Sequence, residues 1–160
     1  MTQAGIPHII FRTSWVYSLR GGNFLTTMQK LAQTRKQIKV VADQTGTPTS
    51  ARAIAESTTH ILGQGLNAGT KKSSIFSHPG IFHISCGGET NWFGFAKTIL
   101  ELSGLSECTE VTPIPTSEYP TLATRPKYSL LSNKKLKQVF HHEMPTWQDA
   151  LQECLGSEPK

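Results

Sequence analysis

Hydrophobic and polar positions alternate along the chain in short blocks of two kinds. Compact, mainly apolar runs at residues 8–11, 38–42, 81–85 and 111–114 predict β-strands. Between these runs, apolar residues recur every three or four positions, which is typical of helices with one buried face. Such helices are expected near residues 23–36, 51–62, 90–102, 133–140 and 147–155. Alternation of strands and helices of these lengths predicts an α/β fold.

Polar residues at the boundaries of these blocks indicate where elements begin and end. Asn23 stands at the start of the first helix, and Ser50 can cap the second. Residues 63–79 are rich in Gly, Lys and Ser and predict a surface loop, while four prolines make residues 113–128 largely non-helical. The buried face of the second helix is expected to contain Ala51, Ile54, Ala55, Thr58, Ile61 and Leu62.

Composition narrows the class of protein without identifying a function. The chain has 160 residues, of which 37% are hydrophobic and 17% charged, values that suit one globular domain with its own core. No apolar run approaches the roughly 20 residues that a membrane helix needs. The first residues do not resemble a signal peptide, so we expect a cytoplasmic protein.

The formal net charge of +5 raises the question of an anionic partner. The basic residues are scattered, and the nearest approach to a cluster is Lys134, Lys135 and Lys137. There is no arginine-rich arm and no row of aromatics among basic residues, so a nucleic-acid partner is not expected. Two interpretations stay open: a solvated basic surface, or cations that contact a phosphate-bearing small ligand.

Local catalytic and metal-binding motifs are absent from the sequence. Cys86, Cys108 and Cys154 are widely spaced, so we expect free thiols and no metal site. The glycines do not form the pattern that brings a backbone close to a dinucleotide pyrophosphate. No tyrosine is followed four residues later by a lysine, and the hydrolase, Walker and His-Glu-x-x-His patterns are also missing.

Three segments are ordinary alone but informative together. Residues 12–24 contain Arg-Thr-Ser-Trp-Val-Tyr followed by Gly-Asn-Phe, and residues 41–49 read Val-Ala-Asp-Gln-Thr-Gly-Thr-Pro-Thr. Residues 115–126 carry Pro-Thr-Ser-Glu-Tyr-Pro and Ala-Thr-Arg-Pro, with Pro-Thr-Trp following at 145–147. In this order and spacing they resemble the dTDP-4-dehydrorhamnose reductases, which are extended short-chain dehydrogenases/reductases. The resemblance runs over residues 8–155 and covers roughly the second half of such an enzyme.

This resemblance implies the C-terminal part of an NAD(P)-binding, Rossmann-like α/β fold whose glycine-rich N-terminal half is absent. Residues 1–160 are then the substrate-binding portion, with an incomplete Rossmann sheet at about 8–42 and a substrate lobe at about 43–155. The complete enzymes use NADPH, or in some members NADH, to reduce dTDP-4-dehydro-L-rhamnose to dTDP-L-rhamnose. The Tyr, Lys and Ser/Thr residues that handle the proton are expected upstream of Met1. The chain alone is therefore expected to be inactive and to need the missing N-terminal half as its partner.

Site residues follow from the same resemblance. Thr13 and Ser14 are expected beside the nicotinamide, and Trp15 would give an apolar wall and an N–H donor. Arg125 is the candidate for gripping the diphosphate, because a guanidinium can hold it bidentately. The substrate-binding residues implied are Trp15, Asn23, Phe24, Gln44, Pro48, Thr49, Tyr119 and Arg125. Each has a plainer alternative: a core position for Trp15, a helix cap for Asn23, a rigid connector for 44–49 and a surface charge for Arg125.

Further expectations concern bound metal and assembly. Some members of the family bridge a dimer through a metal held by a glutamate, and Arg52 stands at the matching position here. A cation cannot be a metal ligand, so bound Mg²⁺ is doubtful, although a homo-oligomer stays possible.

The alternative function is a non-catalytic binding subunit, resembling the regulatory β subunit of methionine adenosyltransferase. If the N-terminal half is missing, an exposed apolar patch is expected around Ile9, Phe11 and Val16. Trp92, Phe93, Phe95 and Trp147 are expected in the core.

Overall fold

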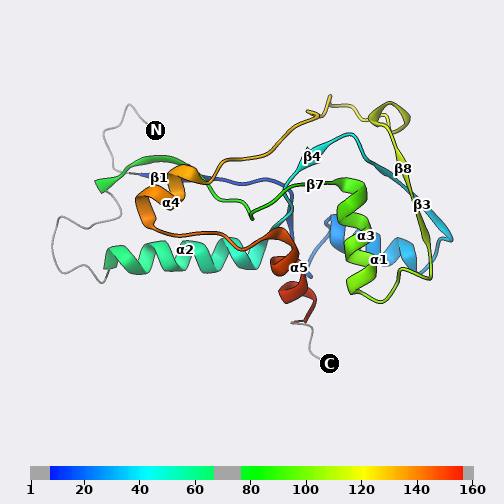
Figure 1. The fold of residues 1–160 in the computed structure, drawn as a ribbon, viewed down its shortest axis with the longest axis horizontal. Coiled ribbons are helices and arrows are strands. Elements are labelled where there is room, and N and C mark those ends of the chain that lie inside the picture. Colours follow the sequence, from blue (N-terminus) through cyan, green and yellow to red (C-terminus); the bar gives the residue numbers. More distant parts are fainter. Residues whose placement is uncertain (1–7, 67–76, 157–160) are drawn as a thin grey trace.

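The computed structural model describes residues 8–66 and 77–156, which form an elongated α/β molecule (Figure 1). The predicted strands and helices are confirmed to within a few residues. The helix after Ser50 continues to Leu66, into the range predicted to be a loop, and residues 67–76 of that range lie outside the described residues. The elements are β1 (Ile9–Arg12), β2 (Val16–Tyr17), α1 (Phe24–Ala32), β3 (Gln37–Val41), β4 (Thr45–Gly46), β5 (Thr49–Ser50), α2 (Ala51–Leu66), β6 (Gly80–His83), β7 (Thr90–Asn91), α3 (Trp92–Leu102), β8 (Glu110–Ile114), the 3₁₀ turn η4 (Thr116–Glu118), α4 (Lys134–Phe140) and α5 (Trp147–Gly156).

The strands pair two by two. β1 pairs with β6 and β3 pairs with β8, both in parallel, and these two sheets lie at opposite ends of the molecule in Figure 1. Two shorter pairs, parallel β2–β5 and antiparallel β4–β7, complete the described sheets. The pairing crosses the boundary expected near residue 43, because β1 and β3 each pair with a strand that lies far beyond it.

The main core forms where α1, α3 and α5 pack together. Leu25 of α1, Phe95 and Ile99 of α3 and Leu151 of α5 are almost completely buried, and Tyr17 of β2 joins them. Truncating one of these aliphatic side chains to alanine would cost about 2–5 kcal/mol of folding free energy. The core thus fixes β2 and the start of α1, which border the predicted site.

A second, smaller cluster supports the β1–β6 sheet. Phe82 of β6 packs with Ile61 of α2 and with Leu136 and Phe140 of α4. The predicted face of α2 is only partly right: Ile61 is buried, but Ala55 and Leu62 are exposed. The buried stripe instead contains Ala53 and Ser57, four residues apart. A polar residue is tolerated there because the Ser57 hydroxyl donates to the Met144 sulfur at 3.0 Å.

Apolar side chains remain exposed near the β1–β6 sheet. Val16, Ile81 and Leu62 are each at least 40% exposed. The expected patch is confirmed at Val16, whereas Ile9 and Phe11 are half-buried because they pack against the second cluster. Among the described residues, no helix is long and apolar enough to cross a membrane.

Candidate functional site

Trp15 follows the carboxyl end of β1 and has an uncommon backbone conformation, with φ of 47°. Its indole stacks on that of Trp92, the first residue of α3, with ring centroids 3.7 Å apart and planes within 10°. The expectation that Trp92 lies in the core is partly right: its side chain packs against the core but is only half-buried. A non-glycine residue in the left-handed region is held there by its surroundings, here the stacked indole.

Phe24 and Gly46 complete the surroundings of this indole pair. The Phe24 ring lies 4.7 Å from Trp92 and 5.5 Å from Phe95, so it links the pair to the core. Gly46 leaves room for Trp15: a Cβ at this position would lie 2.5 Å from the Trp15 ring. The structure therefore brings two predicted site residues, Trp15 and Phe24, together with two that sequence reasoning missed.

Gln44 joins this aromatic group through hydrogen bonds. Its side-chain carbonyl accepts from Trp92 Nε1 at 3.2 Å, and its amide donates to Thr116 Oγ1 at 3.0 Å. Thr116 in turn donates to the Asp43 carboxylate through both its hydroxyl and its backbone N–H. The hydrogen bond from the Thr116 hydroxyl, more than any other contact, holds the pKa of Asp43 below its usual range.

Asn23 acts as the N-cap of α1. Its Oδ1 accepts from the backbone N–H groups of Leu25 and Thr26, while its Nδ2 donates to the Ser18 carbonyl at 2.8 Å. The backbone N–H of Asn23 donates to Thr26 Oγ1, which completes a capping box. The capping interpretation is confirmed, and a substrate contact by Asn23 stays a prediction.

Residues 47–49 form a buried connector between β4 and α2. Pro48 and Thr49 are buried, the Thr47 hydroxyl donates to the Gly88 carbonyl at 2.7 Å, and Thr49 Oγ1 accepts from Cys86 N. These contacts agree with the alternative of a rigid connector. They leave Pro48 and Thr49 as supports for the site rather than exposed contacts.

The two residues predicted to lie beside the cofactor differ in exposure. Thr13 is exposed at the carboxyl end of β1, whereas Ser14 is half-buried and donates to the Thr47 carbonyl at 3.4 Å. Of the two hydroxyls, that of Thr13 is the more accessible to a ligand.

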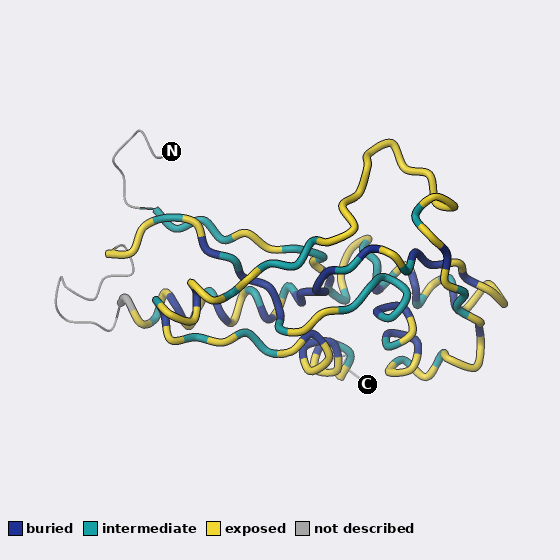
Figure 2. Tube along the Cα trace, turned by 45° about the horizontal axis from the view of Figure 1, so that its top comes forward, coloured by how far each residue is buried: buried dark blue, intermediate teal, exposed yellow. Residues whose placement is uncertain are grey.

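Tyr119 and Arg125 lie on a loop that stands clear of the body. Residues 117–128 are all exposed, and Figure 2 shows them as a long exposed excursion of the chain. Within the described residues, no ion pair involves Arg125. Backbone hydrogen bonds from Thr45 N to the Lys127 carbonyl and from Ser129 N to the Thr45 carbonyl tie the far end of this loop to β4.

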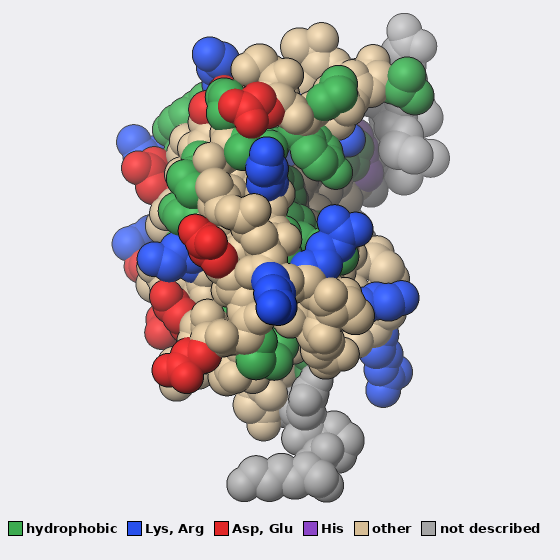
Figure 3. Space-filling model, turned by 90° about the vertical axis from the view of Figure 1, so that its right-hand side faces the viewer, with side chains coloured by type: hydrophobic (Ala, Val, Ile, Leu, Met, Phe, Trp, Pro, Cys, Tyr) green, Lys and Arg blue, Asp and Glu red, His purple; other side chains and the backbone are tan. Residues whose placement is uncertain are grey.

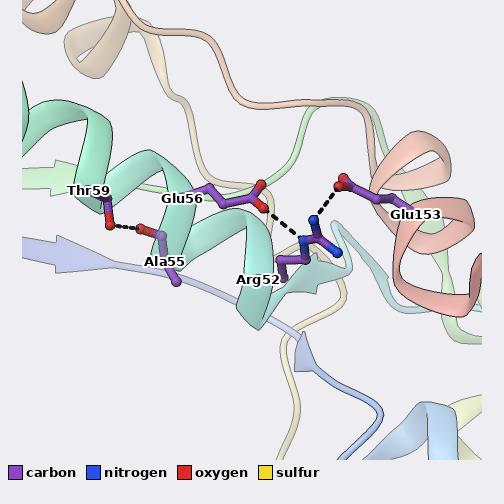
Figure 4. Close-up of polar contacts among 5 residues, drawn as sticks. All are labelled: Arg52, Ala55, Glu56, Thr59 and Glu153. Atoms are coloured by element: carbon purple, nitrogen blue, oxygen red, sulfur yellow. Dashed lines mark hydrogen bonds and ion pairs between the residues drawn. The ribbon is translucent and has the colours of Figure 1, made fainter. Parts of the chain in front are cut away.

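Arg52 lies between two carboxylates (Figure 4). Its guanidinium contacts Glu56 one turn along α2 at 2.7 Å and Glu153 of α5 at 3.0 Å. Hydrogen bonding to Glu56 and the charge of Glu153 raise the pKa of Arg52 further. These contacts place a cation where the family resemblance suggests a metal-binding glutamate. No group of three or more metal-binding side chains occurs among the residues that the structure describes.

The charged side chains do not gather into one basic surface on the face seen in Figure 3. Lys and Arg are spread over that face among acidic and apolar side chains. None of the three cysteines forms a disulfide, as expected; Cys86 and Cys154 are buried and Cys108 is exposed.

Solved structures with this arrangement define the class of protein. A dTDP-4-dehydrorhamnose reductase from Bacillus anthracis, in complex with NADP, aligns with a TM-score of 0.82 and 30% identity over 99% of this chain and 51% of that chain. A dTDP-glucose 4,6-dehydratase from the same organism aligns with a TM-score of 0.68 at 15% identity, over 97% of this chain and 45% of that chain, and so shares the fold alone. The chain thus has the α/β fold of the C-terminal portion of extended short-chain dehydrogenases/reductases.

Sequence comparison gives the family. The model of the RmlD substrate binding domain matches residues 1–158, and the chain belongs to that family. It is 40% identical to a dTDP-4-dehydrorhamnose reductase of Burkholderia thailandensis over 97% of this chain and 53% of the relative. It is 39% identical to the spore coat polysaccharide biosynthesis protein SpsK of Bacillus subtilis, over 91% of this chain and 46% of the relative. The chain therefore spans about half the length of the curated relatives it matches.

Proposed function

We propose that this chain is the substrate-binding half of a dTDP-4-dehydrorhamnose reductase. In the complete enzyme, NADPH or NADH would reduce dTDP-4-dehydro-L-rhamnose to dTDP-L-rhamnose. The observation that carries the proposal is the stacked Trp15–Trp92 pair beside the carboxyl end of β1. Open α/β sheets bind their ligands at the carboxyl ends of the strands. Family membership supports the same substrate class.

The binding roles divide between a fixed wall and an exposed loop. Trp15, backed by Trp92 and Phe24, offers an apolar surface for the sugar ring. Arg125 and Tyr119, both exposed on the loop anchored to β4, would bind the diphosphate and the nucleoside. Gln44 links the wall to the loop.

The cofactor supplies the hydride, and this chain contributes only a small part of its site. The hydroxyl of Thr13, exposed at the end of β1, could make a hydrogen bond with the nicotinamide. The hydroxyl of Ser14 already donates a hydrogen bond to the Thr47 carbonyl. The sequence contains neither a glycine-rich dinucleotide turn nor a tyrosine and lysine four residues apart. We therefore assign cofactor binding and proton transfer to an N-terminal half outside these 160 residues.

The β1 edge supports a partner of this kind. His8 and Arg12 use their carbonyls to pair with β6, so the backbone groups of Ile9 and Phe11 face the other edge of β1. Within the described residues, no strand pairs with that edge. A parallel strand from the N-terminal half would satisfy these groups, and its connections would cover Val16 and Ile81.

Arg52 bears on metal and assembly. Because its guanidinium already neutralises Glu56 and Glu153, we propose that this position holds no bridging Mg²⁺. Any homo-oligomer would then need a different contact. A melting temperature that rises on adding MgCl₂ to the protein, but not to Glu153→Gln, would contradict this assignment.

Titration with thymidine diphosphate in a calorimeter tests the binding role. Arg125→Ala is expected to weaken binding roughly ten- to a hundredfold, because a charge-assisted bidentate contact is lost. Arg35→Ala, which removes an exposed arginine beyond the end of α1, is the matched control and should leave affinity unchanged.

Two outcomes would contradict the proposal. Equal loss of affinity in both variants would show that only net charge matters. Binding that is insensitive to Arg125→Ala would remove this residue from the site and favour the alternative of a non-catalytic binding subunit.

A further inference from the structure

Four polar side chains form a continuous chain of hydrogen bonds between the exposed loop and the indole pair. Trp92 Nε1 donates to Gln44 Oε1 at 3.2 Å, Gln44 Nε2 donates to Thr116 Oγ1 at 3.0 Å, and Thr116 Oγ1 donates to Asp43 Oδ1 at 2.5 Å. We call these residues, Trp92, Gln44, Thr116 and Asp43, the relay. They come from α3, the β3–β4 connection and η4, which are far apart in sequence.

The chemistry of its two ends fixes the direction of every bond in the relay. An ionised carboxylate only accepts, so the Thr116 hydroxyl donates to Asp43 and offers its lone pairs to Gln44. An indole N–H only donates, so the Gln44 carbonyl must face Trp92. Both requirements select the same orientation of the Gln44 amide. Since Gln44 is 8% exposed, turning it over would leave buried groups without partners, at a cost of about 1–3 kcal/mol each.

The loop that carries Tyr119 and Arg125 begins and ends beside the relay. Thr116 starts the loop and bonds Asp43 and Gln44, while Lys127 and Ser129 end it on the backbone of Thr45. Both ends of the loop are therefore tied to three consecutive residues, 43–45. If η4 moves, the hydrogen bond from Gln44 to Thr116 transmits the movement to the Gln44 amide, and the bond from Trp92 to Gln44 transmits it to the Trp92 ring.

We propose that Trp92 is a positioning residue for Trp15. Thr116 and Gln44 hold Trp92 in a fixed position relative to the loop that binds the nucleoside diphosphate. The proposal rests on the proposed function for the role of Trp15 as the sugar wall. The loop and the wall are then one unit: the relay orients Trp92, and Trp92 holds Trp15 by stacking.

The indole pair provides its own optical signature. Two nearly parallel indoles 3.7 Å apart couple their electronic transitions and give a paired positive and negative band in circular dichroism. The third tryptophan, Trp147, lies edge-on to Phe95 in the core and does not belong to the pair. Trp15→Phe identifies the coupled bands by removing them.

Two variants break the relay without touching either indole. Thr116→Val removes the central hydroxyl at nearly constant shape, and Gln44→Met removes both side-chain hydrogen bonds at nearly constant length. The matched control is Thr112→Val on β8, whose hydroxyl accepts from Gln37 Nε2 at the same 3.0 Å but lies outside the relay. Each variant is first checked for a cooperative unfolding transition.

We expect both relay variants to lose most of the coupled signal and Thr112→Val to keep it. Thymidine diphosphate should bind the relay variants about three- to tenfold more weakly than the wild type, as for one lost hydrogen bond. Gln44→Glu, which keeps an acceptor for Trp92 Nε1, should restore part of the signal. A full signal in folded Thr116→Val and Gln44→Met would overturn the proposal.

The optical test does not depend on the proposed function, because it is made without ligand. If the wild type fails to bind thymidine diphosphate while the relay variants lose the coupled signal, the function fails and the positioning role stands. If binding weakens while the signal stays, the loop contacts the ligand without the relay, and the positioning role fails.

Discussion

At the scale of single residues, the site depends on one close approach. Gly46 on β4 leaves the space in which the Trp15 ring lies, and a Cβ there would also meet Ser129 Oγ at 2.7 Å. The hydroxyl of Ser129 donates to the Thr45 carbonyl, so it cannot move without loosening the end of the exposed loop. The Trp15 ring also stacks on Trp92. Gly46 and Trp92 together fix the position of Trp15.

Gly46→Ala is expected to displace Trp15 and weaken thymidine diphosphate binding, with a cost of about 1–3 kcal/mol in folding free energy from overpacking. Gly63→Ala is the control, because a methyl group there meets nothing within 4 Å and α2 should gain about 0.5–1 kcal/mol. Urea unfolding and calorimetric titration measure the two effects. Unchanged binding by a folded Gly46→Ala variant would contradict the confinement of Trp15.

At this scale the sequence pointed to Trp15 but gave no sign of its pairing with Trp92. The Arg-Thr-Ser-Trp segment pointed to Trp15 through family resemblance, and the structure stacks Trp15 on Trp92, which Phe24 and Gln44 contact. Trp92 was expected only as a core residue, with no part in the site. Only its pairing with Trp15, 77 positions away in the chain, reveals the difference. Long-range stacking leaves no periodic signal in a sequence.

At the scale of elements, α2 meets the chain that follows α4 through two histidines. The rings of His60 and His142 lie 4.8 Å apart, and His142 Nε2 is buried without a hydrogen-bond partner among the described residues. Burial, and secondarily the charge of His60, lower the pKa of His142 below its ordinary 6.5. Packing of α4 on α2 therefore favours neutral His142.

This junction predicts a dependence of stability on pH. The unfolded chain binds a proton at His142 more readily than the folded one, so stability falls as pH drops below 6.5 and through the lower folded pKa. His142→Asn should reduce the loss of urea midpoint between about pH 7.5 and about pH 5.5, while the exposed control His78→Asn should not. An equal loss in wild type and His142→Asn would assign the effect to other groups.

The elements themselves were largely predictable, and their partners were not. Apolar spacing located α1, α3, α4 and α5, and Asn23 marked the start of α1. The pattern gave the face of α2 only in part, because it placed Ala55 and Leu62 on the buried face and missed Ser57, which is buried against a methionine sulfur. Nothing in the spacing of β1 or β3 indicated that they pair with β6 and β8, since parallel pairing is decided by packing of distant segments.

At the scale of the whole molecule, the two ends of the domain differ in how completely their apolar side chains are covered. The end with α1, α3 and α5 holds the main core and carries the indole pair. The other end carries the two-stranded β1–β6 sheet, with Val16 and Ile81 exposed. A sheet of two parallel strands is small for an α/β fold, and parallel sheets are normally covered on both faces. The proposed N-terminal half would extend and cover this sheet.

The most direct measurement is the activity of a fusion in which the remaining half of the Burkholderia thailandensis relative precedes this chain. We expect the fusion to oxidise NADPH only when dTDP-4-dehydro-L-rhamnose is present. Trp15→Ala should lower that rate without abolishing cofactor binding, because the sugar wall belongs to this chain. A folded fusion that binds NADPH but does not turn over this substrate would contradict the account.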